Sequence, residues 1–389
     1  MTHSHDIDAA GRQPEALKEP LTLLDRVRDI APTLVTSPRF RSWIARIPVF
    51  RALSRHQTQG LFDLCAGFVY SQILNAFVET GMLEALEAGP QTPEHLAAKT
   101  GLAPHAAERL LRAAAALGLA GRRSGGRYGL GLRGAALIGN PGVLAMIRHH
   151  RDLYADLADP VALLHGSAPQ SRIARYWSYL SDDQADRLCS DAATEYSHLM
   201  ALSQKMIAEI VTDSFPFRDY GRIADIGGGT GVFLEHVAAR APTSELSLFD
   251  LPPVAAQAEK RLAEAGLADR IVAVGGDFMS DPLPPGQDLV TLVRVVYDHN
   301  DATVTALLRA CRAALNDRGA LLIAEPVSGS GPGAKVADAY FGFYLMAMGS
   351  GDTRTPDEHT TLLRQAGFGQ VTFLSTTVPD QVRLVLARP

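Results

Sequence analysis

The stretch "GRIADIGGGTGVFLEHVAARA" at residues 221–241 decides the fold. Its first part reads as a short apolar strand around Asp225, its middle is a glycine turn, and its last part has the apolar periodicity of a helix. Glycines in such a turn let the backbone approach a ligand closely, and the N-terminus of the next helix favours negative charge. The stretch therefore predicts a strand, a ligand-binding loop and a helix in succession.

Alternating strand and helix patterns continue to the end of the chain. The segments with these patterns are 245–252, 254–267, 270–279, 288–297 and 319–327. Two further strand patterns, 370–376 and 381–389, come last and are expected to pair antiparallel at an edge. Such alternation is typical of a doubly wound α/β sheet. We therefore predict a mostly parallel, Rossmann-like domain over residues 216–389.

Residues 57–215 read as a helical domain that resembles a winged helix. The apolar run at 60–86 is expected to form a buried helix or pair of helices with a break at Gly81. Thr92 can cap the next helix with Pro93 at its first position. A second, alanine-rich helix and a tight hairpin follow, which is the order of elements in a winged helix.

The predicted wing at 121–130 carries Arg122, Arg123 and Arg127. Two interpretations are open, namely DNA recognition and a protein–protein module. The helix at 104–119 offers few side chains that read bases, and the formal net charge of −5 argues against wholesale nucleic-acid binding. We favour the protein–protein module.

Residues 1–56 read as a polar tail followed by a basic arm. The arm contains Trp43 among several arginines, so it could rest on an anionic membrane surface or pack on a partner subunit. The tail has no apolar leader, and no later stretch reads as long and apolar enough to span a bilayer. Three distant cysteines form no disulfide framework or zinc ribbon. We expect a cytoplasmic protein, with peripheral contact to the inner or photosynthetic membrane as an alternative.

The candidate cofactor site combines the glycine loop with acidic residues at successive strand ends. Gly227 and Gly229 in this loop do not fit the dinucleotide fingerprint G-x-G-x-x-G, because Val232 stands at its last position. Asp250 follows the second strand, where a carboxylate can bind both hydroxyls of a ribose. Asp277 and Phe278 follow the third, where they could bind the amino group and the face of an adenine.

Carboxylates at strand ends cost solvation free energy unless a partner compensates them. A ligand with a ribose, an adenine and no phosphate fits Asp225, Asp250 and Asp277. S-adenosylmethionine (SAM) has these parts, and its ammonium and sulfonium suit an acidic site. The sequence therefore predicts SAM as the cofactor, and no metal is expected.

Several motifs resemble the small-molecule O-methyltransferases that carry an N-terminal winged-helix dimerisation domain. They are "DIGGGTG", "LFDLP", "GGDF", "IAEP" and "RTPDE", in the order and spacing of that family. The segments at 37–72 and 338–351 resemble its bacterial carotenoid branch, which methylates the tertiary hydroxyl of hydroxyneurosporene and demethylspheroidene. The resemblance implies a homodimer, a SAM-binding role for the strand-end residues, and methylation of an acyclic carotenoid.

The family's catalytic base is a histidine at the end of the fourth strand, oriented by two glutamates. Here Tyr297 stands in its place and His299 in the place of the family's tryptophan; Glu325 matches the first glutamate, and Thr353 replaces the second. Three interpretations stay open: His299 is the base, Tyr297 orients the substrate oxygen, or positioning alone suffices. If 297–299 were extended, both side chains would point to one side. The following Asn300 is expected to cap a helix.

The family's acceptor-lining helix corresponds to the aromatic segment around residues 335–355. Its candidate lining residues are Tyr340, Phe341, Tyr344 and Met348, which suit an apolar, elongated acceptor. His149, His150 and Tyr154 could also line a pocket. Two alternatives remain, namely methylation of a phenolic or polyketide hydroxyl, and a SAM-binding regulator without transferase activity. The altered base site also allows a lost or redirected reaction.

Overall fold

The computed structural model describes residues 48–166, 171–174 and 191–389, together with isolated positions between 29 and 43. The polar tail, most of the basic arm and Cys189 lie outside the described residues. The chain divides into two units, Met1–Gln72 and Ile73–Pro389. The long helix α3 (Pro48–Glu79) runs from the first unit into the second.

The predicted winged-helix pattern is confirmed in the second unit. Thr92 caps α5 by accepting a hydrogen bond from the backbone N–H of His95, and Gly101 ends that helix with a positive φ of 68°. The hairpin β1–β2 follows the second helix directly. The elements are α4 (Met82–Glu87), α5 (Pro93–Thr100), α6 (Pro104–Ala116), β1 (Ala120–Arg122), β2 (Tyr128–Leu130), α7 (Leu132–Ile138), α8 (Pro141–Asp156) and α9 (Pro160–Leu164).

The wing arginines are partly used by the wing itself. The guanidinium of Arg123 donates to the backbone oxygens of Arg122 and Leu130, and Nε of Arg127 donates to the backbone oxygen of Ser124. These bonds direct two of the three basic side chains toward the hairpin, which supports the protein–protein interpretation over DNA recognition.

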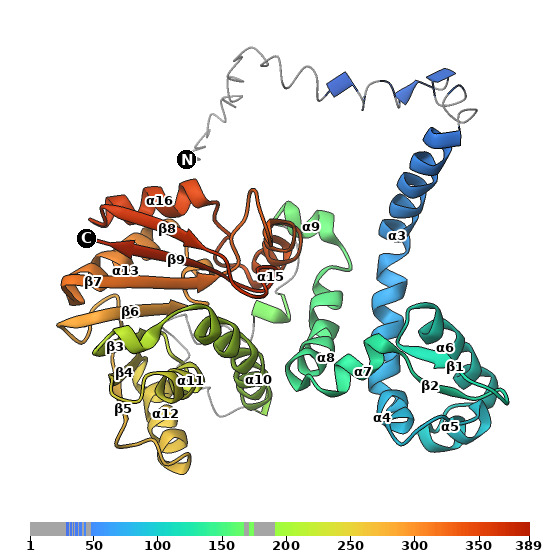
Figure 1. Ribbon diagram of the computed structural model, residues 1–389, viewed down its shortest axis with the longest axis horizontal. Coiled ribbons are helices and arrows are strands. Elements are labelled where there is room, and N and C mark those ends of the chain that lie inside the picture. The colour runs from blue at the N-terminus through green and yellow to red at the C-terminus, as the bar shows by residue number, and fades with distance from the viewer. Residues whose placement is uncertain are drawn as a thin grey trace, which may run out of the picture. The chain divides into compact units, whose positions relative to one another are not determined.

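The sheet of the second unit has seven strands in the order β5-β4-β3-β6-β7-β9-β8 (Figure 1). The five strands from β5 to β7 are parallel, and β9 pairs antiparallel with both β7 and β8, so the predicted antiparallel edge pair is confirmed. The strands are β3 (Arg222–Ile226), β4 (Glu245–Asp250), β5 (Ile271–Gly275), β6 (Gln287–Val293), β7 (Leu315–Glu325), β8 (Gln370–Leu374) and β9 (Arg383–Arg388). The strand order reverses between β3 and β6, which is where such sheets bind ligands.

Helices cover both faces of this sheet, as a doubly wound fold requires. Neighbouring residues of one strand enter opposite core layers, since Ile223 packs with α10, α11 and α12, whereas Ala224 packs with α13 and α16. The larger helices are α10 (Asp191–Ser214), α11 (Val232–Arg240), α12 (Pro252–Glu264), α13 (Asp301–Ala314), α15 (Gly342–Met348) and α16 (Pro356–Gln365). The shorter ones are η3 (Phe217–Asp219), η4 (Val296–Asp298), α14 (Ala334–Val336) and η5 (Ala337–Phe341).

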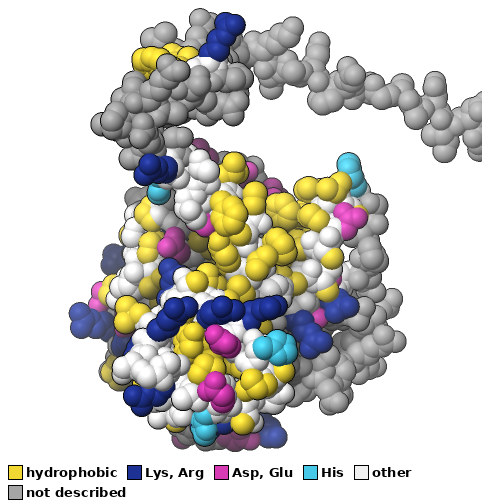
Figure 2. Space-filling view, turned by 90° about the vertical axis from the view of Figure 1, so that its right-hand side faces the viewer, with side chains coloured by type: hydrophobic (Ala, Val, Ile, Leu, Met, Phe, Trp, Pro, Cys, Tyr) yellow, Lys and Arg dark blue, Asp and Glu magenta, His cyan; other side chains and the backbone are white. Residues whose placement is uncertain are grey.

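The prediction that residues 60–86 are buried is wrong for their first half. The break at Gly81 is present, but α3 is one continuous helix before it, and Leu64 and Phe68 are 79% and 70% exposed. Figure 2 shows hydrophobic side chains gathered on one face of the molecule. An apolar sequence indicates burial, but it does not say whether the covering atoms belong to the same chain.

The stretch Arg55–Glu79 of α3 is also long and apolar enough to cross a membrane, judged by length and composition alone. This differs from the sequence prediction, because the apolar run was assigned to a globular core. A helix that packs against a second subunit can have the same length and apolar composition. These two properties alone therefore assign no membrane role to α3.

Candidate active site

The glycine loop after β3 adopts a backbone that only glycine tolerates well. Gly227, Gly229 and Gly231 have φ values of 69°, 57° and 83°, in the left-handed region. A Cβ on Gly227 would lie 2.8 Å from a methyl carbon of Val295, so the loop is closely packed on that side. A Cβ on Gly229 would meet no atom within 4 Å, so a ligand can approach the backbone there.

A buried carboxylate, that of Asp225, and a partly buried one, that of Asp250, lie beside this loop. Asp250, the last residue of β4, accepts hydrogen bonds from the backbone N–H groups of Gly229 and Leu251 at 2.8 and 2.7 Å. Asp225 accepts one from the hydroxyl of Thr291 at 2.6 Å, and its other oxygen has no hydrogen-bond partner. Burial raises the pKa of Asp250 to about 6 and that of Asp225 to about 7. Both carboxyls are therefore suited to a ligand that brings positive charge.

Asp277 and Phe278 lie just past the strand to which the sequence assigned them. The strand β5 ends at Gly275, and the carboxylate of Asp277 accepts the backbone N–H of Met279 at 2.8 Å. The ring of Phe278 meets that of His299 edge to face, with 5.5 Å between centroids. The loop after β5 thus contacts the end of β6, next to the glycine loop.

The end of β6 is a tight turn and is not the extended strand that the sequence predicted. The strand stops at Val293, Arg294 has a φ of 58°, and Val296–Asp298 form a 3-10 turn. Among the described residues, Arg294 is the one non-glycine residue with positive φ, and such outliers gather at functional sites.

The condition that Tyr297 and His299 point to one side is therefore not met. The ring of Tyr297 is buried against Phe341, with 6.0 Å between centroids, whereas His299 packs on Phe278. Nε of Arg294 donates to the Tyr297 hydroxyl at 3.2 Å. Burial raises the pKa of Tyr297 well above its usual value and lowers that of His299.

Glu325 ends β7 as predicted and supports the backbone of the turn. Its carboxylate is fully buried and accepts the N–H of Tyr297 at 3.0 Å. Nε2 of His359, on α16, lies 3.5 Å from its other oxygen. Burial raises the pKa of Glu325 to about 8 and lowers that of His359 to about 4. Sequence reasoning missed His359, because nothing local links α16 to the end of β7.

Arg354 is a second site residue that sequence reasoning did not single out. Its side chain is 4% exposed, and its guanidinium donates to the backbone oxygens of Val296 and His299 at 3.0 and 2.7 Å. It also donates to the carboxylate of Asp301, at the start of α13. Arg354 directly follows Thr353, which stands where the family has its second glutamate. This place in the sequence was the signal that could have pointed to Arg354 as a site residue. Asn300 caps α13 as predicted.

The predicted acceptor-lining residues gather with Tyr297 in one buried cluster. Tyr344 and Met348 belong to it, and Tyr340 and Phe341 pack against it. The hydroxyl of Tyr344 lies 3.0 Å from Nε2 of His149, and that of Tyr340 lies 2.7 Å from Nε2 of His150. The helix α8 therefore packs on this cluster through its two histidines.

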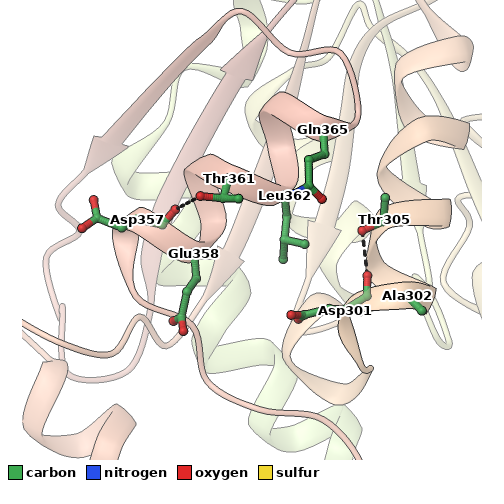
Figure 3. A pocket seen from close by; sticks show the side chains of 8 residues that line it. All are labelled: Asp301, Ala302, Thr305, Asp357, Glu358, Thr361, Leu362 and Gln365. Carbon is green, nitrogen blue, oxygen red and sulfur yellow. Dashed lines mark hydrogen bonds between the residues drawn. The ribbon is translucent and has the colours of Figure 1, made fainter. Parts of the chain in front are cut away.

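A hollow of about 420 Å3 lies apart from this cluster, between α13 and α16. Figure 3 shows the side chains that line it, among them those of Asp301, Asp357 and Glu358. Asp301 is bound to Arg354, and Glu358 caps α16 in a reciprocal pair with Thr355. Two of these three carboxylates therefore already have structural partners, and we assign the hollow no role.

Replacing Glu325 by glutamine is expected to change how stability depends on pH. Glutamine keeps an oxygen for the Tyr297 N–H but does not titrate. The folded-state pKa of Glu325, about 8, lies above that of the unfolded chain. The stability linked to this carboxyl is therefore full at pH below ~4.5 and is lost as pH rises through about 8.

Chemical unfolding at several pH values, followed by far-ultraviolet circular dichroism, checks this expectation. Between pH ~5 and ~8 the variant should gain at least ~1.4 kcal/mol relative to the original chain, which corresponds to one pKa unit. Glu245→Gln, on the exposed start of β4, serves as the control and should show no such trend. Parallel pH curves for the Glu325 variant and the original chain would contradict the expectation.

Comparison with known proteins adds independent information. Residues 154–369 match an O-methyltransferase domain family, and residues 62–138 match an O-methyltransferase dimerisation domain. The chain is 44% identical to demethylspheroidene O-methyltransferase of Cereibacter sphaeroides, over 87% of this chain and 89% of that protein. It is 41% identical to the enzyme of the same name from Rhodobacter capsulatus, over 89% and 86%.

Solved structures share the fold. The SAH-bound form of CalO1, a methyltransferase in calicheamicin biosynthesis, superposes with a TM-score of 0.72 at 26% identity. The match covers 86% of this chain and 98% of that one. It extends over both the helical N-terminal domain and the sheet.

Proposed function

Because the chain belongs to the O-methyltransferase family with an N-terminal dimerisation domain, we propose that it methylates the tertiary hydroxyl of an acyclic carotenoid of the hydroxyneurosporene or demethylspheroidene type. The similarity to two demethylspheroidene O-methyltransferases over most of the chain carries this proposal. SAM is the methyl donor, as expected for this family. The buried, aromatic cluster of the acceptor side supports an apolar acceptor.

We propose that the glycine loop and the strand-end carboxylates hold SAM. Asp250 would bind the ribose hydroxyls, and Asp277 with Phe278 would bind the adenine. The open approach to Gly229 and the unpartnered oxygen of Asp225 suit the methionine part, whose ammonium is positive. Bound SAM supplies an electrophilic methyl group, and no residue needs to form a covalent intermediate.

On the acceptor side we place Tyr297 with Tyr340, Phe341, Tyr344 and Met348. These side chains cluster around Tyr297, just past the end of β6, and there we place the substrate oxygen close to the methyl group. Holding two reactants in line can remove ~7–11 kcal/mol of the barrier, so this positioning supplies a large part of the catalysis.

The three predicted catalytic residues take different places in this proposal. Because His299 contacts Phe278, we place it on the cofactor side, and because Tyr297 contacts Phe341, we place it on the acceptor side. Glu325 acts on the backbone of Tyr297 and orients the turn. None of the three is then well placed to accept the substrate proton.

We also propose a homodimer formed by residues 57–215, in the cytoplasm. The dimerisation-domain match and the exposed apolar side chains of α3 support it, since a second copy would cover them. Contact of the basic arm, within residues 1–56, with the inner or photosynthetic membrane would bring the enzyme to its acceptor. Flotation with anionic vesicles tests that contact.

The proposed reaction is tested by incubating the protein with labelled SAM and a detergent-dispersed acyclic hydroxycarotenoid. Label in the carotenoid, as a methyl ether at the tertiary carbon, supports the proposal. A phenol panel runs in parallel. Transfer to a phenol alone would overturn the carotenoid assignment, and binding of SAM without any transfer would indicate a lost or redirected reaction.

Replacing Asp250 by asparagine is expected to weaken SAM binding by about 10- to 100-fold, or ~1.4–2.7 kcal/mol. The variant keeps one acceptor oxygen but loses the charge and the second acceptor that a ribose needs. Calorimetry measures the affinity directly. Asp269→Asn, at an exposed position before β5, is the control and should bind SAM like the original chain. Equal affinity of the Asp250 variant would exclude the ribose assignment.

A further inference from the structure

Two tyrosine–histidine pairs join α8 to the segment after β7. Nε2 of His150 lies 2.7 Å from the hydroxyl oxygen of Tyr340, and Nε2 of His149 lies 3.0 Å from that of Tyr344. The two residues of each pair are 190 and 195 positions apart in the chain, so neither pair arises from local structure. The function proposed above uses the tyrosines as walls and leaves the imidazoles without a role.

We infer that His150 and Tyr340 form a proton relay that takes the proton of the acceptor hydroxyl during methyl transfer. This inference rests on the proposed function, since an aliphatic alcohol is the kind of acceptor that needs such help. The residue in the place of the family's base, Tyr297, cannot provide it, because its phenol is buried and receives a hydrogen bond from Arg294.

Tyr340 is placed to meet the acceptor. It lies in the π-helical turn η5 (Ala337–Phe341), and single π-turns are frequent at functional sites. Its ring is 4.9 Å from that of Phe341, which in turn contacts Tyr297. Burial raises the pKa of the Tyr340 phenol. The positive charge of Arg294 opposes this effect and lowers the pKa, but by less. A positive group thus lies near the oxygen through which the proton would pass.

His150 is better placed than His149 to complete the relay. His149 is buried at 8% exposure, whereas His150 is half-buried and can pass a proton to solvent. Burial lowers the pKa of His150 below its usual value, so its imidazole is neutral and can accept a proton at neutral pH.

Several groups face this pair among the described residues. Tyr340 reaches His150 from η5, and Tyr154 packs on its ring from the next turn of α8. His149 and Asp152, also on α8, interact electrostatically within the same cluster. Tyr344 of α15 binds His149 and stacks on Tyr340, and Arg294 acts on both tyrosines.

The step balances without any other reactant. The acceptor oxygen forms a bond to the methyl carbon while the carbon–sulfur bond of the sulfonium breaks, and its electron pair stays on sulfur. The acceptor proton moves to the hydroxyl oxygen of Tyr340 as the phenol proton moves to Nε2 of His150. The products are the methyl ether, S-adenosylhomocysteine and an imidazolium, so one positive charge is present before and after.

The test compares His150→Gln and Tyr340→Phe with the original full-length protein, at saturating SAM and hydroxycarotenoid. Glutamine still accepts a hydrogen bond from Tyr340 but cannot take a proton. Both variants are expected to lose about 100-fold in kcat, with little change in KM or in SAM affinity by calorimetry. The original protein should lose activity as pH falls below the pKa of His150, and His150→Gln should lack this dependence. His149→Gln should retain it.

A second measurement needs no acceptor. Nuclear magnetic resonance of the imidazole ring, assigned with His150→Gln, should give His150 a pKa below ~6.5. Tyr340→Phe should raise that pKa, because it removes the hydroxyl that stabilises the neutral ring. A normal pKa that does not respond to Tyr340→Phe would overturn the relay.

The remaining outcomes separate the relay from the proposed function. If the original protein methylates the carotenoid and both variants keep its rate and pH dependence, the relay is wrong and the function stands. If the original protein methylates phenols but no alcohol, the carotenoid assignment fails, and the relay fails with it.

Discussion

Replacing Gly351 by alanine is expected to cost about 2–5 kcal/mol of unfolding free energy and to abolish methyl transfer. Gly351 has a φ of 81°, and an added Cβ would lie 2.1 Å from the backbone oxygen of Tyr297 and 2.7 Å from the carbonyl carbon of Asp298. Both neighbours are backbone atoms, so no side chain can rotate away. The turn that carries Tyr297 must therefore move.

Gly349→Ala provides a matched control for this prediction. Gly349 has the same φ of 81°, but an added Cβ there meets nothing within 4 Å. It should lose only the ~1–2 kcal/mol of a left-handed residue and keep most of its activity. Chemical unfolding and the transfer assay measure both variants. Equal losses would show that the contact with the turn does not matter.

Replacing Arg354 by methionine is expected to destabilise the protein by about 2–5 kcal/mol and to lower methyl transfer. Methionine fills a similar volume but donates no hydrogen bond. The backbone oxygens of Val296 and His299 would lose their donors, at ~1–3 kcal/mol for each unsatisfied group. Asp301 is mostly exposed and adds little to this loss.

Arg364→Met, on the exposed face of α16, is the control and should change stability by less than ~0.5 kcal/mol. Chemical unfolding gives the difference, and SAM affinity shows whether the turn still supports the cofactor side. An Arg354 variant that unfolds at the same denaturant concentration as the original chain would contradict this account of the turn.

Local signals predicted the fold well because each carries its own physical cause. Thr92 and Asn300 cap their helices as the sequence indicated, and the glycine loop needs the conformations found at Gly227 and Gly229. The alternation of strands and helices predicted the doubly wound sheet and its antiparallel edge pair. These features depend on residues close together in the chain.

The site was less predictable where distant segments meet. The hydrogen bonds of Arg354 to the turn and the pairing of His150 with Tyr340 join elements tens to hundreds of residues apart. The left-handed backbone of Arg294 ends β6 early, and no local pattern distinguishes such a residue from one in a strand. The exposed half of α3 was predicted as core, because apolar composition does not specify which chain covers it.

The tyrosines that pack beside the turn after β6 also determine which optical signal can follow acceptor binding. The two tryptophans, Trp43 and Trp177, precede the sheet in the chain, whereas Tyr297, Tyr340 and Tyr344 pack together in the proposed acceptor site. No tryptophan is part of the sheet itself, so its strands contribute no tryptophan fluorescence of their own. Near-ultraviolet dichroism of the tyrosines, in contrast, should respond when an acceptor enters.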